Sequence, residues 1–304
     1  MTGNTGNTGN TGNTGNTGNT GNTGNTGEIG GVGWFIPDRV DLPFVTRLQP
    51  GGPKELGELL RTQPTHFGDR LWAANWYAWR VLHQFIANVP GWAATVDADV
   101  SFTTIRNDLV AHYDTQIHEL VLAARDERPD AMGAILSQDA EFFTDFMAVL
   151  TIRPGSHPQS WRVLNIASLI GSFAALYFKG KYDLPRPSQI CPALLPPIPV
   201  PGHSSWPSGH STQAHLMKNF MLRVFAATAA TPTPMSAADQ AVLSDDLTVL
   251  ADEIARNREI AGLHYPKDSE GGARLADLLN GILAAGVVPM LDAAITSAAN
   301  EWLP

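Results

Sequence analysis

Helical periodicity runs through most of this chain of 304 residues and constrains its fold more than any other feature. Apolar residues recur at spacings of three and four, which places them on one face of an α-helix. The segments with this pattern are 54–62, 67–89, 102–125, 130–152, 159–181, 209–229, 237–264 and 270–302. No Asn-Gly or Asp-Gly turn separates two alternating runs, as a β-hairpin would require. The sequence therefore predicts an all-α fold, a single-domain helical bundle.

The N-terminal segment lacks this helical periodicity and is a short tandem repeat instead. Residues 2–25 are eight copies of Thr-Gly-Asn, which continue into Thr26-Gly27. The repeat has no apolar side chain to bury, and its glycines raise the entropy cost of ordering the backbone. We therefore expect residues 1–29 to form a disordered tail and residues 30–304 to form the helical domain. A Gly- and Pro-rich lead-in, residues 30–53, is expected to pack Trp34, Phe35 and Phe44 onto that domain.

Composition narrows the class of partner. The chain has 43% hydrophobic residues, 16% charged residues and a net charge of −9, which fits a globular protein and argues against nucleic acid as a partner. The uncharged and largely apolar run at residues 163–178 is 16 residues long, short of the roughly 20 apolar residues of a membrane span. We expect it to be a core helix. The N-terminus lacks the basic and apolar segments of a secretory signal, so a cytoplasmic protein is expected.

Three short segments carry most of the residues suited to chemistry. They are 179–187 (KGKYDLPRP), 207–210 (PSGH) and 258–268 (REIAGLHYPKD). Arginine binds phosphate oxygens in bidentate fashion, lysine adds a point charge, and a Ser-Gly turn at a helix start offers backbone amides. Two histidines can divide the roles of nucleophile and proton donor. Together these residues indicate a site for a tetrahedral oxyanion.

The predicted helices place some of these residues relative to one another. His264 and Asp268 are four residues apart and would share one helix face, so the carboxylate could accept one imidazole N–H and leave the other nitrogen free to react. Arg258 precedes His264 by six residues, about 120° around a helix, and would reach across the pocket.

Prolines set the boundaries near the first two segments. Pro185 and Pro187 should end the helix that carries Lys179, which leaves Arg186 just beyond its end. Residues 188–206 are then expected to form a loop, and Ser208-Gly209 should open the next helix.

The order and spacing of these residues resemble the signature of the superfamily that joins type 2 phosphatidic acid phosphatases, bacterial acid phosphatases and vanadium-dependent haloperoxidases. The matching positions span about 90 residues and are Lys179, Arg186-Pro187, Pro207-Ser208-Gly209-His210, Arg258, His264 and Asp268. One position departs, because the superfamily usually has Ser before the last arginine and this chain has Asn257. The resemblance implies an all-α bundle of the acid phosphatase/haloperoxidase type.

The resemblance also implies a role for each matching residue. The phosphoryl oxygens would be held by Lys179, Arg186, Arg258, the Ser208 hydroxyl and the Gly209 amide.

In the same comparison His264 would attack phosphorus to form a phosphohistidine, and Asp268 would orient it. His210 would protonate the leaving alcohol and then activate water. The three cations would do the work of a metal ion, so a metal-independent phosphomonoester hydrolase without a cofactor is implied.

The haloperoxidase branch is the alternative. There the same pocket holds vanadate as cofactor, with His264 bonded to vanadium and His210 assisting peroxide binding. Two features favour the phosphatase. Leu184-Pro185, rather than an aromatic residue, precedes Arg186, and only 20 residues separate Arg186 from Pro207, where haloperoxidases tend to have longer insertions. A small phosphate ester is thus the expected ligand, with vanadate as the alternative, and a non-catalytic anion-binding protein is disfavoured because every catalytic position is filled.

Other polar residues are expected to be structural. His112, Asp114 and His118 should lie on a solvated helix face rather than bind metal, because a six-residue spacing splays the two rings. His203, seven residues before His210, is expected to be an ordinary loop residue.

The aromatic residues and the cysteine are read in the same way. Core packing is expected for Trp72, Trp76, Tyr77 and Trp79. For Trp206, directly before PSGH, bracing of the loop and contact with substrate both stay open. The single cysteine, Cys191, excludes an internal disulfide and is expected to be a small buried apolar residue.

Overall fold

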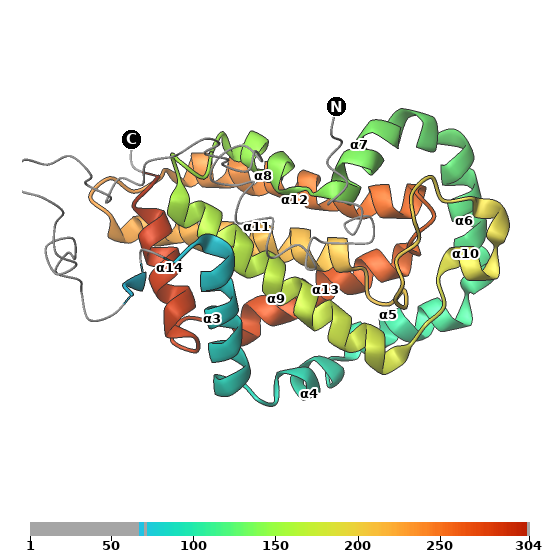
Figure 1. Cartoon of the computed structure of the whole chain (residues 1–304), viewed down its shortest axis with the longest axis horizontal. Helices are drawn as coiled ribbons and strands as arrows, with labels where there is room; N and C mark the ends of the chain where they lie inside the picture. The colour runs from blue at the N-terminus through green and yellow to red at the C-terminus, as the bar shows by residue number, and fades with distance from the viewer. Residues whose placement is uncertain (1–66, 70–71, 303–304) are drawn as a thin grey trace, which may run out of the picture.

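A computed structural model of the protein describes residues 67–69 and 72–302 (Figure 1). The repeat tail, the lead-in and the predicted helix at 54–62 lie outside the described residues. Within the described part the secondary structure is helical and contains no strand, which confirms the all-α prediction. The α-helices there are α3 (Ala74–Asn88), α4 (Trp92–Asp97), α5 (Val100–Ala111), α6 (Tyr113–Asp126), α7 (Arg128–Ala140), α8 (Phe143–Leu150), α9 (Pro158–Tyr182), α10 (Pro187–Ile190), α11 (Gly209–Ala227), α12 (Ala237–Ile260), α13 (Pro266–Ile282) and α14 (Pro289–Ala299).

Two long helices, α9 and α11, pack against each other in the middle of the fold (Figure 1). Their close approach depends on Gly171 of α9, where a Cβ would lie only 3.1 Å from the Cα of Gln213 in α11. Helices α12 and α13 pack on α11, and helices α3 and α14 pack on α9. The last turns of α9 thereby lie beside the first turn of α11, where the candidate site is found.

The apolar character of α9 follows from this central position. Within the described residues, one segment, Pro158–Ile190, is long and apolar enough to cross a membrane, and 72% of its most apolar window is buried inside the fold. The expected core helix at 163–178 is therefore part of α9, and Lys179 lies in its last turn.

Two predicted helices before α9 are each divided into two. The segment 102–125 breaks at His112 into α5, which packs on α13, and α6, which packs on α7 and α12. The segment 130–152 breaks at residues 141–142, where the Glu141 carboxylate accepts a hydrogen bond from the Thr144 amide and caps α8. A turn of this kind keeps the three-and-four spacing of apolar residues, so periodicity alone does not reveal it.

The C-terminal boundaries also differ from the prediction. Helix α12 ends at Ile260 instead of residue 264, because Gly262 adopts a φ of 77°. The segment 270–302 is two helices, and α13 begins at Pro266. Between α13 and α14 the chain turns at Gly286, whose φ is 89°, and Pro289 opens α14. These Gly and Pro residues are ordinary helix stop and start signals that the periodicity obscured.

The boundaries around the first two motif segments are confirmed. Helix α9 ends at Tyr182 and Arg186 lies just beyond it, as the N-cap of the short helix α10. Ser208 is the N-cap of α11, and Gly209 is its first residue. The segment 188–206 is mostly loop, although it includes the end of α10 and a 3₁₀ turn at Pro192–Leu194.

Candidate functional site

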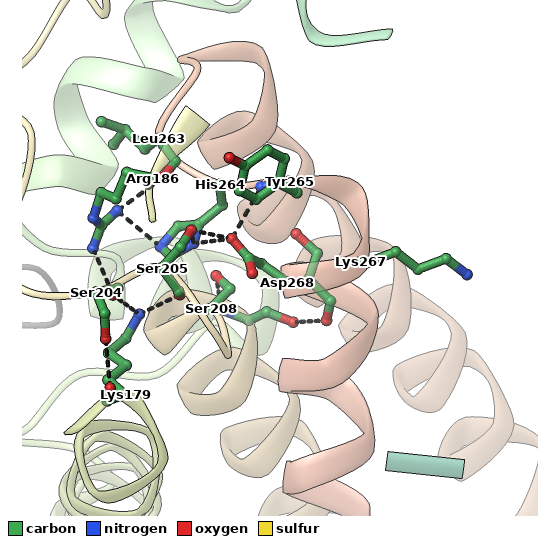
Figure 2. Close-up of polar contacts among 12 residues, drawn as sticks. Lys179, Arg186, Ser204, Ser205, Ser208, Leu263, His264, Tyr265, Lys267 and Asp268 are labelled. Carbon is green, nitrogen blue, oxygen red and sulfur yellow. Dashed lines mark hydrogen bonds and ion pairs between the residues drawn. The ribbon is translucent and has the colours of Figure 1, made fainter. Parts of the chain in front are cut away.

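The three motif segments meet between α9, α11 and the turn that joins α12 to α13. Figure 2 shows His264 between Arg186 and Asp268, with Lys179 approaching from α9. All six ionisable residues of the predicted site expose 3% or less of their surface: Lys179, Arg186, His210, Arg258, His264 and Asp268. Ionisable groups are rarely buried so deeply unless they are paired or functional, so this cluster is the first candidate for a site.

His264 and Asp268 form the hydrogen-bonded pair that the sequence predicts, but by a different geometry. The Nδ1 of His264 lies 2.9 Å from Oδ2 of Asp268. His264 precedes α13 instead of lying on a helix, and Asp268 lies in the first turn of α13. The same Oδ2 also accepts from the Tyr265 amide at 3.0 Å and from the Ser205 hydroxyl. The expectation of a shared helix face was therefore wrong, and a carboxylate near a helix N-terminus makes the pair instead.

These contacts fix the tautomer of His264. A carboxylate accepts, so Nδ1 carries the proton, and Nε2 keeps its lone pair 3.4 Å from Nη1 of Arg186. Burial lowers the pKa of His264 well below its ordinary value, and Arg186 and Lys179 lower it further. Burial raises the pKa of Asp268 to about 6, against the opposing effect of Lys179. At neutral pH His264 is therefore an uncharged imidazole with a reactive Nε2.

Lys179 and Arg186 are buried without a carboxylate in ion-pair contact among the described residues. Lys179 Nζ donates to the carbonyls of Ser204 at 2.9 Å and Ser205 at 2.5 Å. Arg186 donates to the carbonyls of His203 at 2.8 Å and Leu263 at 2.9 Å. Burial lowers the pKa of Arg186 to about 10, and burial and Arg186 together lower the pKa of Lys179. These carbonyls orient the two cations but supply no neutralising charge.

Arg258 is the third buried cation, and it is held by α7. Its Nη2 donates to the Ile135 carbonyl at 2.8 Å, and its Nη1 lies 3.7 Å from Oδ1 of Asp139. Nε and Nη1 have no hydrogen-bond acceptor among the described residues. Because α12 ends at Ile260, Arg258 and His264 do not share a helix, and the 120° argument for their relation was wrong.

His210 contacts a residue that the motifs do not include. Its Nε2 lies 3.1 Å from the backbone carbonyl of Gln138, at the end of α7. The ring also packs on Phe142, with ring centroids 5.2 Å apart. Burial lowers the pKa of His210 well below its ordinary value, and the nearby Arg258 lowers it further. The neutral ring therefore donates from Nε2, which leaves Nδ1 as the acceptor.

A narrow cavity lies within the cluster. Its wall consists of Ser172, Ala175, Leu176, Lys179, His203, Gly209, His210 and His264. As the first residue of α11, Gly209 has an amide that no residue within the helix accepts, so this amide is one suited to binding an anion. Ser208 serves instead as the N-cap, since its hydroxyl accepts from the Ser211 amide at 3.4 Å.

The cavity therefore brings together four of the eight predicted site residues, and the other four support it or lie close by. Arg186 lines a second, wider cavity with residues 183–185 and 200–204, and His203 belongs to both walls. Asp268, Ser208 and Arg258 are absent from both walls.

Two residues of the site were missed by sequence reasoning. His203 was expected to be an ordinary loop residue, but its Nδ1 lies 3.1 Å from Nη2 of Arg186. Burial, Lys179 and Arg186 lower its pKa to about 4. Ser205 bonds Asp268 and accepts from Lys179 through its carbonyl. No motif marks these two residues in the sequence. They could have been suspected only because the loop that contains them joins two predicted site residues, Arg186 and Ser208, and so has to pass near the site.

The remaining expectations have mixed outcomes. His112 and His118 are exposed as predicted, and within the described part of the chain no group of three His, Cys, Asp or Glu residues is placed to hold a metal ion. Trp206 is fully buried and packs on Phe102, so it braces the loop. Tyr77 is in the core as expected, and Trp72 packs partly buried against it.

Two expectations of burial were wrong. Trp76 and Trp79 expose 48% and 43% of their surface, because they lie on the outer face of α3. Cys191 is only half-buried, in the loop that follows α10.

Comparison with protein families and with curated proteins finds no match to this chain. The chemistry of the site must therefore be argued from its own geometry.

Proposed function

We propose that this protein is a metal-independent phosphomonoester hydrolase that acts through a phosphohistidine on His264. The observation that carries the proposal is the state of His264, a buried neutral imidazole with Nδ1 held by Asp268 and Nε2 beside the Arg186 guanidinium. A nucleophilic imidazole needs its lone pair fixed next to groups that attract the anion to be attacked.

Charge supports an oxyanion as the ligand. Among the residues that the structure describes, the buried cations Lys179, Arg186 and Arg258 have two nearby carboxylates, Asp268 and the more exposed Asp139. Burying an unneutralised cation is costly, so a bound dianion would stabilise the cluster. A phosphate monoester has this charge and offers several acceptor oxygens to the Lys179 ammonium and the Gly209 amide.

The reaction would take place in two steps. A dianion bound beside His210 favours its protonated form, which carries a proton on Nδ1 as well as on Nε2. In the first step, Nε2 of His264 forms a bond to phosphorus, the bond from phosphorus to the ester oxygen breaks, and His210 gives the Nδ1 proton to the leaving alcohol. In the second, His210 takes a proton from water as the water oxygen attacks phosphorus. The phosphorus–nitrogen bond then breaks and phosphate is released. Asp268 stabilises the positive charge that develops on His264.

A vanadium-dependent haloperoxidase is the second candidate, favoured by the apolar wall that Ala175 and Leu176 form in the cavity that His210 also lines. Vanadate has the shape of phosphate, and the same residues fit it: Lys179 and the Gly209 amide would bind its oxygens and His264 Nε2 would bond vanadium. When bound, vanadate activates hydrogen peroxide for halide oxidation. The same residues would bind a phosphoryl group or vanadate, so only an assay can distinguish the two functions.

One side-by-side experiment tests the proposal. Purified protein is assayed on p-nitrophenyl phosphate with and without EDTA, and on bromide with hydrogen peroxide and added vanadate. We expect ester hydrolysis that persists in EDTA, disappears in His264→Ala and is unchanged in His118→Ala, an exposed histidine on α6. Hydrolysis lost in EDTA and restored by a divalent metal would contradict the metal-independent mechanism. Rapid bromide oxidation with negligible ester hydrolysis would select the second candidate.

A further inference from the structure

The one departure from the superfamily signature, Asn257, is connected to His210 by hydrogen bonds. Nδ2 of Asn257 donates to Oε1 of Gln138 at 2.9 Å. The backbone carbonyl of Gln138 in turn accepts from Nε2 of His210 at 3.1 Å. Asn257 and Gln138 are 4% and 2% exposed, so water competes little for these bonds. A side chain of α12 thus holds the residue of α7 that holds His210.

Gln138 is fixed from both ends of its side-chain amide. Its Nε2 donates to Oδ2 of Asp145 at 3.0 Å. Because an ionised carboxylate can only accept, the Gln138 amide must present Nε2 to Asp145 and Oε1 to Asn257. Rotation of this amide would break both bonds, so the network has one consistent arrangement.

The backbone carbonyl of Gln138 can accept a hydrogen bond from His210 because Gln138 lies in the last turn of α7. The last four carbonyls of an α-helix have no N–H donor within the helix, so they accept hydrogen bonds from other groups. The Gln138 carbonyl is one of these four and accepts from His210. One turn earlier, the Ile135 carbonyl accepts from Arg258. The end of α7, which carries no recognisable motif, therefore holds a cation and a histidine of the site, and α7 packs directly on α12 (Figure 1).

We propose that Asn257 and Gln138 are positioning residues that set the tautomer of His210. A carbonyl can only accept, so Nε2 of His210 keeps its proton and Nδ1 is the nitrogen presented to the cavity. This inference rests on the proposed function, in which Nδ1 protonates the leaving alcohol. Without the bond from Asn257, the Gln138 amide is held by Asp145 alone, the end of α7 loosens, and the imidazole is free to take the other tautomer.

The reach of Asn257 explains why asparagine suits this chain. A serine hydroxyl would take the position of the Asn257 Cγ, so its oxygen would lie about 0.8 Å farther from Oε1 of Gln138 than Nδ2 does, because the amide N–H points at about 120° to the C–N bond. The gap would then exceed hydrogen-bond distance. Asn257→Ser, which restores the usual residue of the signature, should therefore impair this protein.

Kinetics on two esters test the proposal. Asn257→Leu removes the donor, and Asn219→Leu is the matched control, because Asn219 is 8% exposed and its Nδ2 donates to Asp277 at 2.9 Å, away from His210. We expect the Asn257 variant to slow an alkyl phosphate about tenfold more than p-nitrophenyl phosphate, whose leaving group needs less protonation. The control should slow both esters by the same factor.

The effect should also depend on His210. In a His210→Ala background, Asn257→Leu should cause no further loss, since there is no imidazole to position. Equal slowing of both esters, or the same added loss in that background, would overturn the proposal. If the leucine variant does not fold, Asn257→Asp keeps the shape and removes the donor, and the same outcomes apply.

A second measurement is independent of hydrolysis. Nitrogen-15 NMR of histidine-labelled protein reports the tautomer of His210, whose signals are identified by their absence in His210→Ala. We expect the Nε2–H tautomer in the wild type and in Asn219→Leu, and a mixture of tautomers in Asn257→Leu. An unchanged tautomer in the Asn257 variant, or an Nδ1–H tautomer in the wild type, would refute the positioning role. A tautomer change in a protein that hydrolyses no ester would count against the proposed function alone.

Discussion

The indole ring of Trp206 lies against the backbone of Gly271, at a position where any side chain on residue 271 would collide with it. A Cβ on Gly271 would approach the ring to 2.0 Å. The contact joins the loop before PSGH to α13, the helix that carries Asp268. Next to it, the Ser208 amide donates to the Asp268 carbonyl at 2.9 Å. The contact of Trp206 with Gly271 and this hydrogen bond together fix the PSGH segment next to the segment that carries Asp268.

This contact makes Gly271→Ala destabilising, although alanine usually favours a helix. Either the ring or α13 must move, which should cost about 2–3 kcal/mol and lower the melting temperature by roughly 5–10 °C. Gly281→Ala on the same helix is the control, because nothing lies within 4 Å of its Cβ, and it should be neutral or slightly stabilising. Calorimetry on both variants measures the difference, and equal melting temperatures would mean that Trp206 does not depend on Gly271.

Asp268→Asn should disable His264 without removing it. An asparagine can present its amide N–H to Nδ1, which would force the imidazole proton onto Nε2, the nitrogen that must attack. We expect kcat for ester hydrolysis to fall by about 10³–10⁴-fold, with a much smaller change in KM. Steady-state kinetics with a parallel melting curve check this, and a variant that keeps its kcat would show that Asp268 does not orient the nucleophile.

Lys179 should be needed for the stabilisation that an anion confers. Phosphate or vanadate at 100 times its Kd should stabilise the wild type by about 2.7 kcal/mol, because it neutralises buried cations. Lys179→Met removes one of them, so added anion should change its melting temperature far less.

Lys267→Met is the control for charge alone. Lys267 points away from the cluster in Figure 2 and pairs with Glu270 at 2.7 Å on the surface. This variant should keep the full response to phosphate. An equal response in the Lys179 variant would place the anion elsewhere.

Stability should fall as the protein is acidified without an anion. Burial lowers the pKa of His210 and His264 well below 6.5, and it lowers the pKa of His203 to about 4. Below pH 6.5 these histidines are therefore protonated in the unfolded chain but stay neutral in the folded protein. The free energy of unfolding then decreases as the pH falls towards 4.

Burial also lowers the pKa of His215, which acts in the same direction. Asp268, whose pKa is raised to about 6, acts in the opposite direction, as do Asp139 and Glu259, whose pKa burial raises. The net decrease is expected because four histidines are affected and the pKa of His210 and His264 is lowered so far.

Denaturant titrations between pH 7 and pH 4 measure this dependence. Saturating phosphate should weaken it, because a bound anion favours the charged histidines. A free energy of unfolding that is constant over this range would show that the histidines are not buried in their neutral form.

The sequence by itself determined the helical class, the extent of α9 and α11, and most of the residues of the candidate site. Lys179, His210, His264 and Asp268 come together because each is adjacent to a helix boundary that local signals define. Pro185 and Pro187 end α9, Ser208 caps α11, and Pro266 opens α13. Propensity, capping and apolar spacing act over only a few residues, so they can be read from the chain without its fold.

Only the tertiary structure decided how the site is completed. The breaks at His112 and Glu141 turn α6, α7 and α8 onto other helices, which brings Gln138 to His210. His203 and Ser205 enter the site because the loop crosses it. The backbone carbonyls of Gln138, His203 and Ser205 accept hydrogen bonds from His210, Arg186 and Lys179, residues 17 to 72 positions away in the chain. Every residue has a backbone carbonyl, so no side-chain pattern in the sequence predicts these contacts. The contribution of these hydrogen bonds to stability depends on their burial away from water, and burial is a property of the packed fold rather than of the local sequence.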